Sequence, residues 1–408
     1  MMRRSSTGLT RRCALVLLGG VGLPLVGAVS GGAAGLTRTA REAEGVPDHA
    51  APPMLRRYFI SADTVTWNYT PQDRDLVMGM PFTAREQRFT RPGPNRLGAV
   101  YEKSQYRRYA DPGFTTLLPR CPDEEYQGIL GPVIRAQVGD TIQVRFRNNT
   151  PFPATMHPHG LFYTKANEGV AADGTSSEQD CPDDMTDPGD VVEPGDIRTY
   201  TWEVPERSGP GPADPSSVVW LYHDHGTAMG VPGTLSGLVG PIVVSRRGSA
   251  GADARPLDVD REMFALFTGF DENHSPYLAR NMARFAPGQD IDPKNQDFQD
   301  TNHKSCINGY LFGNGPDGTT ERSPAMRIRL GERVRWYVFA LGGEDDLHTP
   351  HWHGNTVRVG GRRTDVLELL PASMVTADMR PDDPGVWMFH CHVDDHMMEG
   401  MATRYQVC

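Results

Sequence analysis

The chain repeats one order of strands and histidine motifs in its two halves, and this repetition restricts its possible folds more than any other feature. "VIRAQVGDTIQVRFRN" (133–148) and "MRIRLGERVRWYVFAL" (326–341) each predict two strands separated by a Gly and an acidic residue. Each copy is followed by an HxHG motif, "HPHG" and "HWHG", and later by an HxH motif, "HDH" and "HCH". An order repeated over so long a span indicates two related domains and not a solenoid of short repeats.

The content of Gly and Pro, which end strands and form turns, indicates the fold class. The 44 Gly and 34 Pro residues favour many short strands joined by turns over long helices. We therefore predict an all-β protein built from two antiparallel β-sandwiches. The expected segments are a disordered lead-in at 35–54, a first domain at 55–247, a linker at 248–257 and a second domain at 258–408.

The N-terminus is predicted to be a targeting segment. Four arginines, at positions 3, 4, 11 and 12, flank or precede the apolar run "CALVLLGGVGLPLVGAV". The run is short and rich in Gly and Pro for a membrane span, and "TRRCAL" loosely resembles a twin-arginine export signal. We expect residues 1–34 to be an export signal whose removal leaves an extracellular or cell-envelope protein without a membrane anchor. A simple membrane anchor is the alternative.

The six cysteines are relevant to the predicted export, because disulfides form in exported proteins. Cys13 lies in the predicted signal and Cys391 in the last HxH motif, which leaves four. An exported protein can join four cysteines as two disulfides, and the spacing leaves three connectivities open. We favour one bridge per domain, Cys121–Cys181 and Cys306–Cys408, with an unpaired Cys408 as the alternative.

Ten of the 13 histidines fall in four clusters. Residues i and i+2 of a strand share a face, so each HxH pair presents two imidazoles together. Four pairs supply eight imidazoles that can converge where the domains meet, which is too many for one metal ion and suits two or three. The clusters are His157 and His159; His223 and His225; His348, His351 and His353; and His390, His392 and His396. The other three, His49, His274 and His303, are interpreted as surface residues.

Cys391 stands between His390 and His392, so on a strand it points to the opposite face and cannot share their metal. One strand therefore carries two sites, joined by a short covalent path. Two His, one Cys and a distant Met are the ligands of an electron-transfer blue copper site. The residues that fit this set are His348, Cys391, His396 and Met401. A structural zinc site is the alternative, although it would prefer more thiolates.

Three segments extend this reasoning to a family. "HPHGLFYTKANEGV", "DLHTPHWHGN" and "GVWMFHCHVDDHMMEGM" resemble the multicopper oxidases, and within them the ceruloplasmin-like branch. The resemblance covers about residues 55–247 and 258–408 and implies a cupredoxin-like Greek-key β-sandwich in each. It implies four coppers per functional unit, with His348, Cys391, His396 and Met401 at type 1 copper; His157 and His351 at type 2 copper; and His159, His223, His225, His353, His390 and His392 at the type 3 pair.

The first domain departs from this pattern because Asp224 occupies the position of Cys391. It therefore lacks a type 1 site, as in the two-domain, small laccase-like oxidases. Copper nitrite reductase shares the fold, but its layout differs and the eight-histidine set argues against it. The ceruloplasmin ring closes six domains, so the resemblance implies a homotrimer whose trinuclear sites lie between domain 1 of one chain and domain 2 of the next.

Several acidic residues occupy positions that carry carboxylates in related oxidases. The resemblance implies that Cys391 passes electrons and that Asp394 and Glu168 relay protons. It implies substrate-side carboxylates at Asp395 and Asp300. It also implies a loop that holds calcium at Asp183 and Asp184. Ferroxidases of this kind have a histidine where this chain has Ser305, and His303 is a partial replacement. The expected iron site is thus incomplete.

The predicted function is oxidation of phenols and aromatic amines, one electron at a time, coupled to reduction of O2 to water. Four coppers suit this coupling because the reduction of O2 to water takes four electrons. A metallo-oxidase acting on Fe(II) or Cu(I) is the first alternative, and a non-enzymatic copper-binding protein is a further one. The net charge of −10 argues against a nucleic-acid partner.

Overall fold

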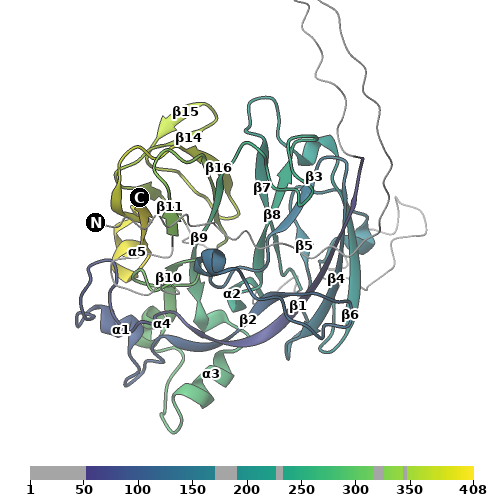
Figure 1. The fold of residues 1–408 in the computed structure, drawn as a ribbon. Coiled ribbons are helices and arrows are strands. Elements are labelled where there is room, and N and C mark those ends of the chain that lie inside the picture. The colour runs from purple at the N-terminus through teal and green to yellow at the C-terminus, as the bar shows by residue number, and fades with distance from the viewer. Residues whose placement is uncertain (1–51, 171–190, 227–232, 316–325, 343–346) are drawn as a thin grey trace, which may run out of the picture. The chain divides into compact units, whose positions relative to one another are not determined.

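The computed structural model describes residues 52–170, 191–226, 233–315, 326–342 and 347–408, and strands dominate them (Figure 1). The predicted all-β fold is confirmed. The predicted export signal lies outside the described residues, as do Cys181, Asp183 and Asp184. Within the described ranges, no helix is long and apolar enough to cross a membrane.

The first half of the chain forms two four-stranded sheets. One has the order β2 (Val100–Tyr109), β1 (Leu55–Asn68), β4 (Thr141–Asn149), β6 (Ile197–Glu203); the other has β3 (Ile134–Gln137), β8 (Val239–Ser245), β7 (Ser217–His223), β5 (His157–Pro158). Along β4, Ile142, Val144 and Phe146 are buried and alternate with partly exposed residues. This period of two places one face of the sheet on the core.

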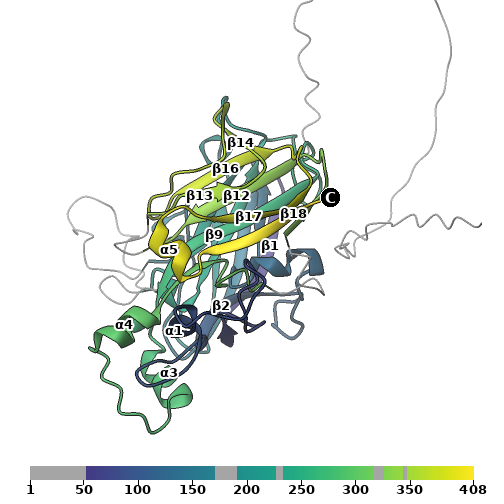
Figure 2. The same ribbon diagram turned by 90° about the vertical axis from the view of Figure 1, so that its left-hand side faces the viewer.

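The second half repeats the arrangement with a wider first sheet. Its six-stranded sheet has the order β10 (His303–Ile307), β9 (Arg261–Asp271), β12 (Val334–Ala340), β16 (Met374–Met379), β14 (Val357–Val359), β15 (Arg362–Thr364); its four-stranded sheet has β11 (Met326–Ile328), β18 (Ala402–Val407), β17 (Gly385–Cys391), β13 (Pro350–Trp352). Trp336, Trp352 and Phe389 pack ring to ring in its core, with centroids 4.8–5.5 Å apart. Figure 2 shows β17 and β18 side by side with α5 (Asp394–Glu399) near one end.

The prediction of purely antiparallel sheets is wrong at one strand pair in each sheet. The pairs β1–β4, β3–β8, β9–β12 and β11–β18 are parallel. Each joins strands far apart in the chain, and a short hairpin cannot connect parallel neighbours. Because the parallel pairs occur at equivalent places in both halves, they also support the internal repeat.

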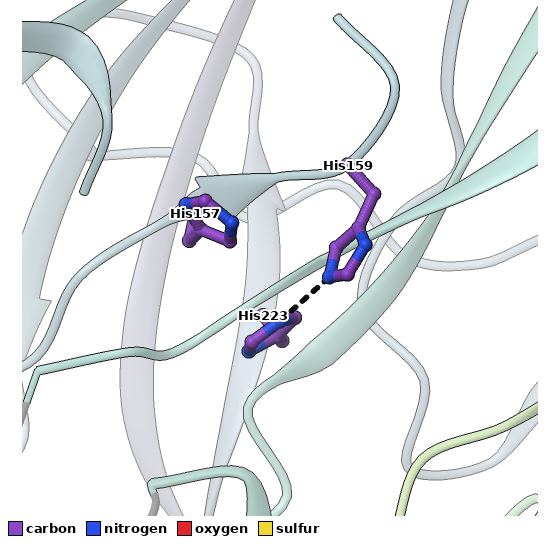
Figure 3. A group of neighbouring side chains, drawn as sticks. All are labelled: His157, His159 and His223. Carbon is purple, nitrogen blue, oxygen red and sulfur yellow. Dashed lines mark hydrogen bonds between the residues drawn. The ribbon is translucent and has the colours of Figure 1, made fainter. Parts of the chain in front are cut away.

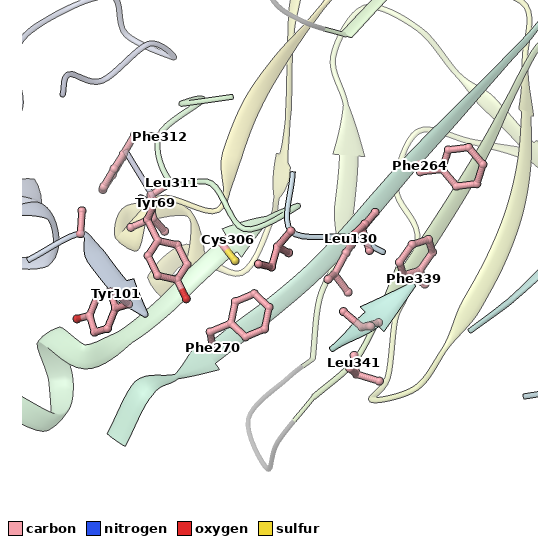
Figure 4. Close-up of a cluster of buried hydrophobic side chains, with 14 of the residues drawn as sticks. Tyr69, Tyr101, Leu130, Phe264, Phe270, Cys306, Leu311, Phe312, Phe339 and Leu341 are labelled. Carbon is pink, nitrogen blue, oxygen red and sulfur yellow. The ribbon is translucent and has the colours of Figure 1, made fainter. Parts of the chain in front are cut away.

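The two halves share a buried apolar cluster (Figure 4). Tyr69, Tyr101 and Leu130 of the first half lie in it with Phe264 and Phe270 of the second half. A fully buried ion pair lies nearby, with the Lys103 ammonium 2.5 Å from a Glu272 carboxylate oxygen that also accepts from the Tyr69 hydroxyl. Such a pair contributes specificity of docking more than net stability.

Short helices lie in the connections between strands. The α-helices are α1 (Glu86–Thr90), α2 (Gly233–Ser236), α3 (Leu278–Phe285), α4 (Gln296–Asn302) and α5; the 3₁₀ turns are η1 (Pro122–Gln127), η2 (Lys165–Asn167), η3 (Glu206–Ser208) and η4 (Glu272–His274). Asn295 is the N-cap of α4, and its side chain accepts from the backbone N–H of Phe298, which is the usual N-cap bond.

The cysteines differ from the predicted pairing. Cys121 is disulfide-bonded, and its predicted partner Cys181 is outside the described residues. The predicted Cys306–Cys408 bridge is wrong. Cys306 is buried on β10 and its thiol contacts the Thr268 carbonyl at 3.4 Å, whereas Cys408 is exposed and bonds the Ile328 carbonyl through its backbone and thiol. Cys306 lies on β10 and Cys408 just after β18, and these strands belong to different sheets of the second half, which the sequence positions alone could not reveal.

Candidate metal centres

Four histidines of the first half gather at the ends of β5 and β7. Figure 3 shows His157, His159 and His223. His157 lies directly opposite His223 in the β5–β7 ladder, and the Nε2 atoms of His159 and His223 are 2.9 Å apart. The ring of His157 is 5.4–5.5 Å from the rings of His159, His223 and His225. After His159 the chain turns at Gly160, where φ is +71° and a Cβ would come within 2.2 Å of the Trp220 ring, so this turn requires glycine.

Four histidines of the second half repeat this geometry at β13 and β17. His351 lies opposite His390 in the ladder, and the Nε2 atoms of His353 and His390 are 3.0 Å apart. The ring of His351 is 4.8–5.6 Å from those of His353, His390 and His392. The turn that follows uses Gly354, with φ of +72° and Trp387 beneath it. The predicted i, i+2 pairs therefore come together in both halves.

Hydrogen bonds to backbone carbonyls orient these rings. In each half, two histidines donate from Nδ1–H: His157 to Glu168 O (2.7 Å), His223 to Asp224 O (2.8 Å), His351 to Asp365 O (3.0 Å) and His390 to Cys391 O (2.8 Å). This leaves Nε2 as the available ligand atom, which is the usual arrangement around a metal-binding histidine. Sequence reasoning missed the contribution of Asp365, which lies beyond the HxHG motif and has no signal of its own.

Burial favours the neutral form of five of these imidazoles by lowering the pKa values of His157, His159, His223, His353 and His390. Burial and then neighbouring histidines lower the pKa of His159 to about 4. Burial is also the largest effect at His223, where the pKa falls to about 3 despite the bond to a carbonyl. Neutral imidazole is the form that binds metals, so these sites are prepared for a cation at neutral pH.

A third group lies beside β17, on the opposite side of the strand from His390. It consists of His348, Cys391 and His396. The two imidazoles face each other through Nδ1, 3.2 Å apart, and the Cys391 sulfur is 3.9 Å from Nδ1 of His348 and 3.8 Å from Nδ1 of His396. Met401 is fully buried, and its backbone bonds both the Cys391 N–H and the His396 carbonyl. The structure thus brings the ligand atoms of His348, Cys391 and His396 together and places the Met401 backbone beside them, with Nδ1 as the inward-facing atom of both histidines.

The Cys391 thiol is easily ionised. Burial opposes ionisation, but hydrogen bonds from His348, His396 and the backbone N–H of Thr349 and Val393 outweigh it and lower the pKa of Cys391 to about 6. At neutral pH the sulfur is therefore a thiolate, the form that binds a metal.

Asp224 has a structural role in the equivalent place of the first half. Its buried carboxylate accepts from the backbone N–H groups of Thr155 (2.6 Å), Gly226 (3.3 Å) and Gly233 (3.1 Å). Burial raises the pKa of Asp224 although these bonds favour the ionised form. A carboxylate occupied in this way supports the loop that carries His225.

The predicted carboxylates lie in different settings. Glu168 supports His157 through its backbone carbonyl, while its carboxylate pairs with Lys165. Asp394 and Asp395 are exposed in the first turn of α5. Asp300 is exposed on α4, where it accepts from Gln296 at 2.7 Å.

Glu399 is a residue that sequence reasoning missed. It is the last residue of α5, and its Oε2 accepts from the Ser305 hydroxyl at 2.7 Å and lies 3.9 Å from Nδ1 of His303. Burial raises its pKa, but the bonds from His303 and Ser305 outweigh this and leave the pKa lowered. An acid three residues after the ligand His396, on the same helix face, was the available signal.

The donor atoms fit copper in kind and spacing. Metal–nitrogen bonds of about 2.0 Å in a tetrahedral site place two nitrogens ~3.3 Å apart, and a metal–sulfur bond of about 2.3 Å places sulfur ~3.6 Å from nitrogen. The nitrogen pairs at 2.9–3.2 Å and the sulfur–nitrogen distances of 3.8–3.9 Å are close to these values. Two His, one Cys and a neighbouring Met favour copper, whereas imidazole-only groups accept several metals.

Comparison with known proteins agrees with this chemistry. The multicopper oxidase family models match residues 126–249 and 288–408, which together make up more than half of the chain. Among curated relatives, Ferroxidase HEPHL1 of Homo sapiens is 39% identical over 359 residues, Hephaestin of Homo sapiens 35% over 357, and Ceruloplasmin of Mus musculus 38% over 362. These alignments cover 86–87% of this chain but 29–32% of the relatives, so the chain spans about a third of their length.

Solved structures support the fold. A crystal structure of a multicopper oxidase matches with a TM-score of 0.53 and 18% identity, covering 89% of this chain and 91% of its own. The blue copper oxidase from Nitrosomonas europaea matches with a TM-score of 0.50 and 18% identity, covering 86% of both chains. With the fold, the donor sets and the matching families in agreement, the chain belongs to the multicopper oxidase family and is similar within it to ceruloplasmin and the hephaestins.

Proposed function

We propose that this chain is a copper-dependent oxidase that couples one-electron oxidation of a small reductant to the reduction of O2 to water. The observation that carries the proposal is that His390 and Cys391 are adjacent at the end of β17, with Cys391 in one donor group and His390 in another. A copper-storage protein or an isolated metal site has no need for two donor groups connected in this way.

The donor groups would hold different types of copper. Copper, when bound, supplies one-electron redox chemistry. His348, Cys391 and His396, with Met401, would hold a type 1 copper. The histidines would hold the other three, with His157 and His351 at type 2 copper and His159, His223, His225, His353, His390 and His392 at the type 3 pair. These assignments rest on the ring and sulfur geometry above and on the family motifs.

The link between the two kinds of site is short. Cys391 and His390 are adjacent, and the Nδ1–H of His390 also donates to the Cys391 carbonyl at 2.8 Å. A few covalent bonds and one hydrogen bond therefore connect Cys391 in one donor group to His390 in the other. This arrangement suits passage of electrons from the thiolate site to the histidine sites.

We further propose that the active unit is a homotrimer. Within the described part of one chain, the histidines of the two halves form separate groups, although a trinuclear site needs both. His225 and His392 are exposed, as expected if another subunit completes each half-site. Head-to-tail contacts between domain 1 (55–247) and domain 2 (258–408) of neighbouring chains would close a ring of three.

The reductant we propose first is a phenol or aromatic amine, with Fe(II) or Cu(I) as the second candidate. Two observations favour the metal ion: relatives named as ferroxidases, and the carboxylate of Glu399 beside His303, one helical turn after His396. Fe(II) favours oxygen and imidazole donors. Against it, Asp300 and Asp395 are exposed, and Ser305 occupies the position of the expected histidine.

We also propose that residues 1–34 direct export. The disulfide at Cys121 supports this proposal, because disulfides persist mainly in oxidising compartments. N-terminal sequencing of the secreted protein tests it: mature protein that begins before residue 28 or retains residue 1 would contradict it.

Oxygen uptake is the test of the proposed function. Copper-loaded protein is supplied in turn with a phenol, Fe(II) and Cu(I), and the stoichiometry of reductant oxidised per O2 consumed is measured. Four electrons per O2 without released peroxide supports the proposal. The matched variants are Cys391→Ser and, as control, Cys408→Ser, which changes an exposed thiol of the same half. Equal activity of both variants would exclude the Cys391 assignment.

A further inference from the structure

A cavity of about 480 Å³ lies in the second half of the chain, lined by β12, β14, β16 and the residues that flank them. No histidine of the metal groups lines it. Figure 1 shows β14 and β15 at the top, away from α5. Five arginines line the cavity, which we call the arginine pocket: Arg333, Arg335, Arg358, Arg363 and Arg380.

The strand register places most of these charges in one row. Arg335 lies opposite Asp378, Asp378 opposite Arg358, and Arg358 opposite Arg363. Residues directly opposite in antiparallel strands project from the same face. The row is held in this register by the two-residue turn at 360–361, where both glycines have positive φ (+54° and +80°), as a type I′ hairpin requires.

The available carboxylates do not neutralise this row. Asp378 is occupied by Arg335, which donates from Nε at 2.7 Å and from Nη2 at 3.2 Å. Asp260, next to the pocket, is occupied by Arg333 at 2.6 and 3.0 Å. The remaining lining acids are Asp258, 3.5 Å from Arg335, and the exposed Asp382.

Two of the arginines make no direct polar contact with the described protein, although the charge of Arg380 helps to lower the pKa of the nearby Asp260. Arg358 and Arg380 are exposed and, among the described residues, form no hydrogen bond or ion pair. Arg363 donates to the hydroxyl of Thr356 at 2.9 Å. Arg358 and Arg363 are like charges in directly opposed positions, which destabilises a sheet. In a chain with a net charge of −10, a concave cationic site of this kind attracts anions locally.

We propose that the arginine pocket binds a small multivalent anion that carries two or more phosphate or carboxylate groups. The planar guanidinium group matches both oxyanions in a two-bond geometry. Arg358 and Arg380 offer unoccupied N–H donors, Arg363 lies beside Arg358, and Thr356 supplies a hydroxyl. The cavity volume is in the range of small-molecule sites. This proposal does not depend on the oxidase function, because no metal ligand lines the pocket.

The test is isothermal titration calorimetry on the copper-loaded full chain at low ionic strength. Sodium pyrophosphate, citrate and inorganic phosphate are the probes. The double variant Arg358→Ala/Arg380→Ala removes the two unoccupied guanidinium groups. Two control variants each carry Arg57→Ala, alone or with Arg145→Ala, so that the latter changes the net charge equally. Arg57 is an exposed residue on β1, and neither control position lines the pocket.

We expect pyrophosphate or citrate to bind the wild type at least tenfold more tightly than inorganic phosphate, and binding to weaken at higher salt. The double variant should lose at least tenfold in affinity and the controls less than twofold. Tighter binding of pyrophosphate identifies a phosphate ligand, and tighter binding of citrate a carboxylate ligand. Thermal unfolding of the double variant without anion should occur at an equal or higher temperature than in the wild type, since the like-charge contact is removed.

Three outcomes would overturn the proposal. The first is no binding of any probe at millimolar concentration, and the second is equal binding by the wild type and the double variant. The third is a double variant that keeps its anion affinity but changes its oligomeric state in light scattering, which would assign the pocket to a subunit contact.

Discussion

Replacement of Asp224 by alanine tests how the first half of the chain holds its histidines without a metal-binding cysteine. The Asp224 carboxylate is buried and accepts from three backbone N–H groups, those of Thr155, Gly226 and Gly233. The Asp224→Ala variant leaves these donors without their acceptor. Gly226 directly follows His225 in the chain, so the segment that carries His225 should lose support.

The expected loss of stability can be worked from these bonds. A buried donor left without a partner costs about 1–3 kcal/mol, so three cost roughly 3–9 kcal/mol. Burial raises the pKa of Asp224, which means that the native state disfavours the carboxylate charge, and its removal offsets part of this cost. We expect a net loss of roughly 3–5 kcal/mol, equivalent to a fall in Tm of roughly 6–20 °C for the half that unfolds.

Asp111→Ala is the matched control. Asp111 also accepts from three backbone N–H groups, those of Gly113, Thr115 and Thr116, but these bonds face solvent. Water can replace that carboxylate, so its removal should lower Tm much less. Calorimetric unfolding of copper-free protein compares the two variants. An Asp224→Ala variant no less stable than Asp111→Ala would refute the argument that burial makes these bonds costly to lose.

Three further predictions concern the metal centres. Cys391→Ser should abolish the blue thiolate-to-copper absorption and the oxidase activity while leaving the other three coppers bound. Copper analysis and electron paramagnetic resonance measure the remaining coppers. A variant that stays blue contradicts the assignment. In copper-free protein, ultraviolet titration of the Cys391 thiolate should give a pKa of about 6, below the ordinary value of 9.0. This group therefore adds its full stability above pH 9, and the contribution is lost as pH falls from 9 through 6. A midpoint near 9 would show that His348 and His396 do not stabilise the thiolate. Glu399→Gln should lower kcat/KM for Fe(II) about tenfold (~1.4 kcal/mol) and kcat/KM for a phenol less than twofold. The control is Glu368→Gln, which changes an exposed glutamate. Equal effects on both substrates would exclude a cation site at Glu399.

The sequence by itself determined the parts of the site that depend on local periodicity. Side chains alternate along a strand, so the spacing of His390, Cys391 and His392 was sufficient to place Cys391 apart from its neighbours. The same rule paired His157 with His159 and His351 with His353. Two turn positions were equally local, because Gly160 and Gly354, which end the HPHG and HWHG motifs, adopt the positive φ that favours glycine.

Tertiary structure alone decided every feature that depends on which distant strands are neighbours. The parallel pairs β1–β4 and β9–β12 join segments with long connections, and Cys306 and Cys408 lie in different environments although each is a single cysteine in an unremarkable context. Glu399 meets Ser305 only because α5 packs near β10, and Arg358 meets Arg363 and Asp378 only through the register of three strands. Register is set by the whole sheet and its turns, and no short stretch of sequence contains it.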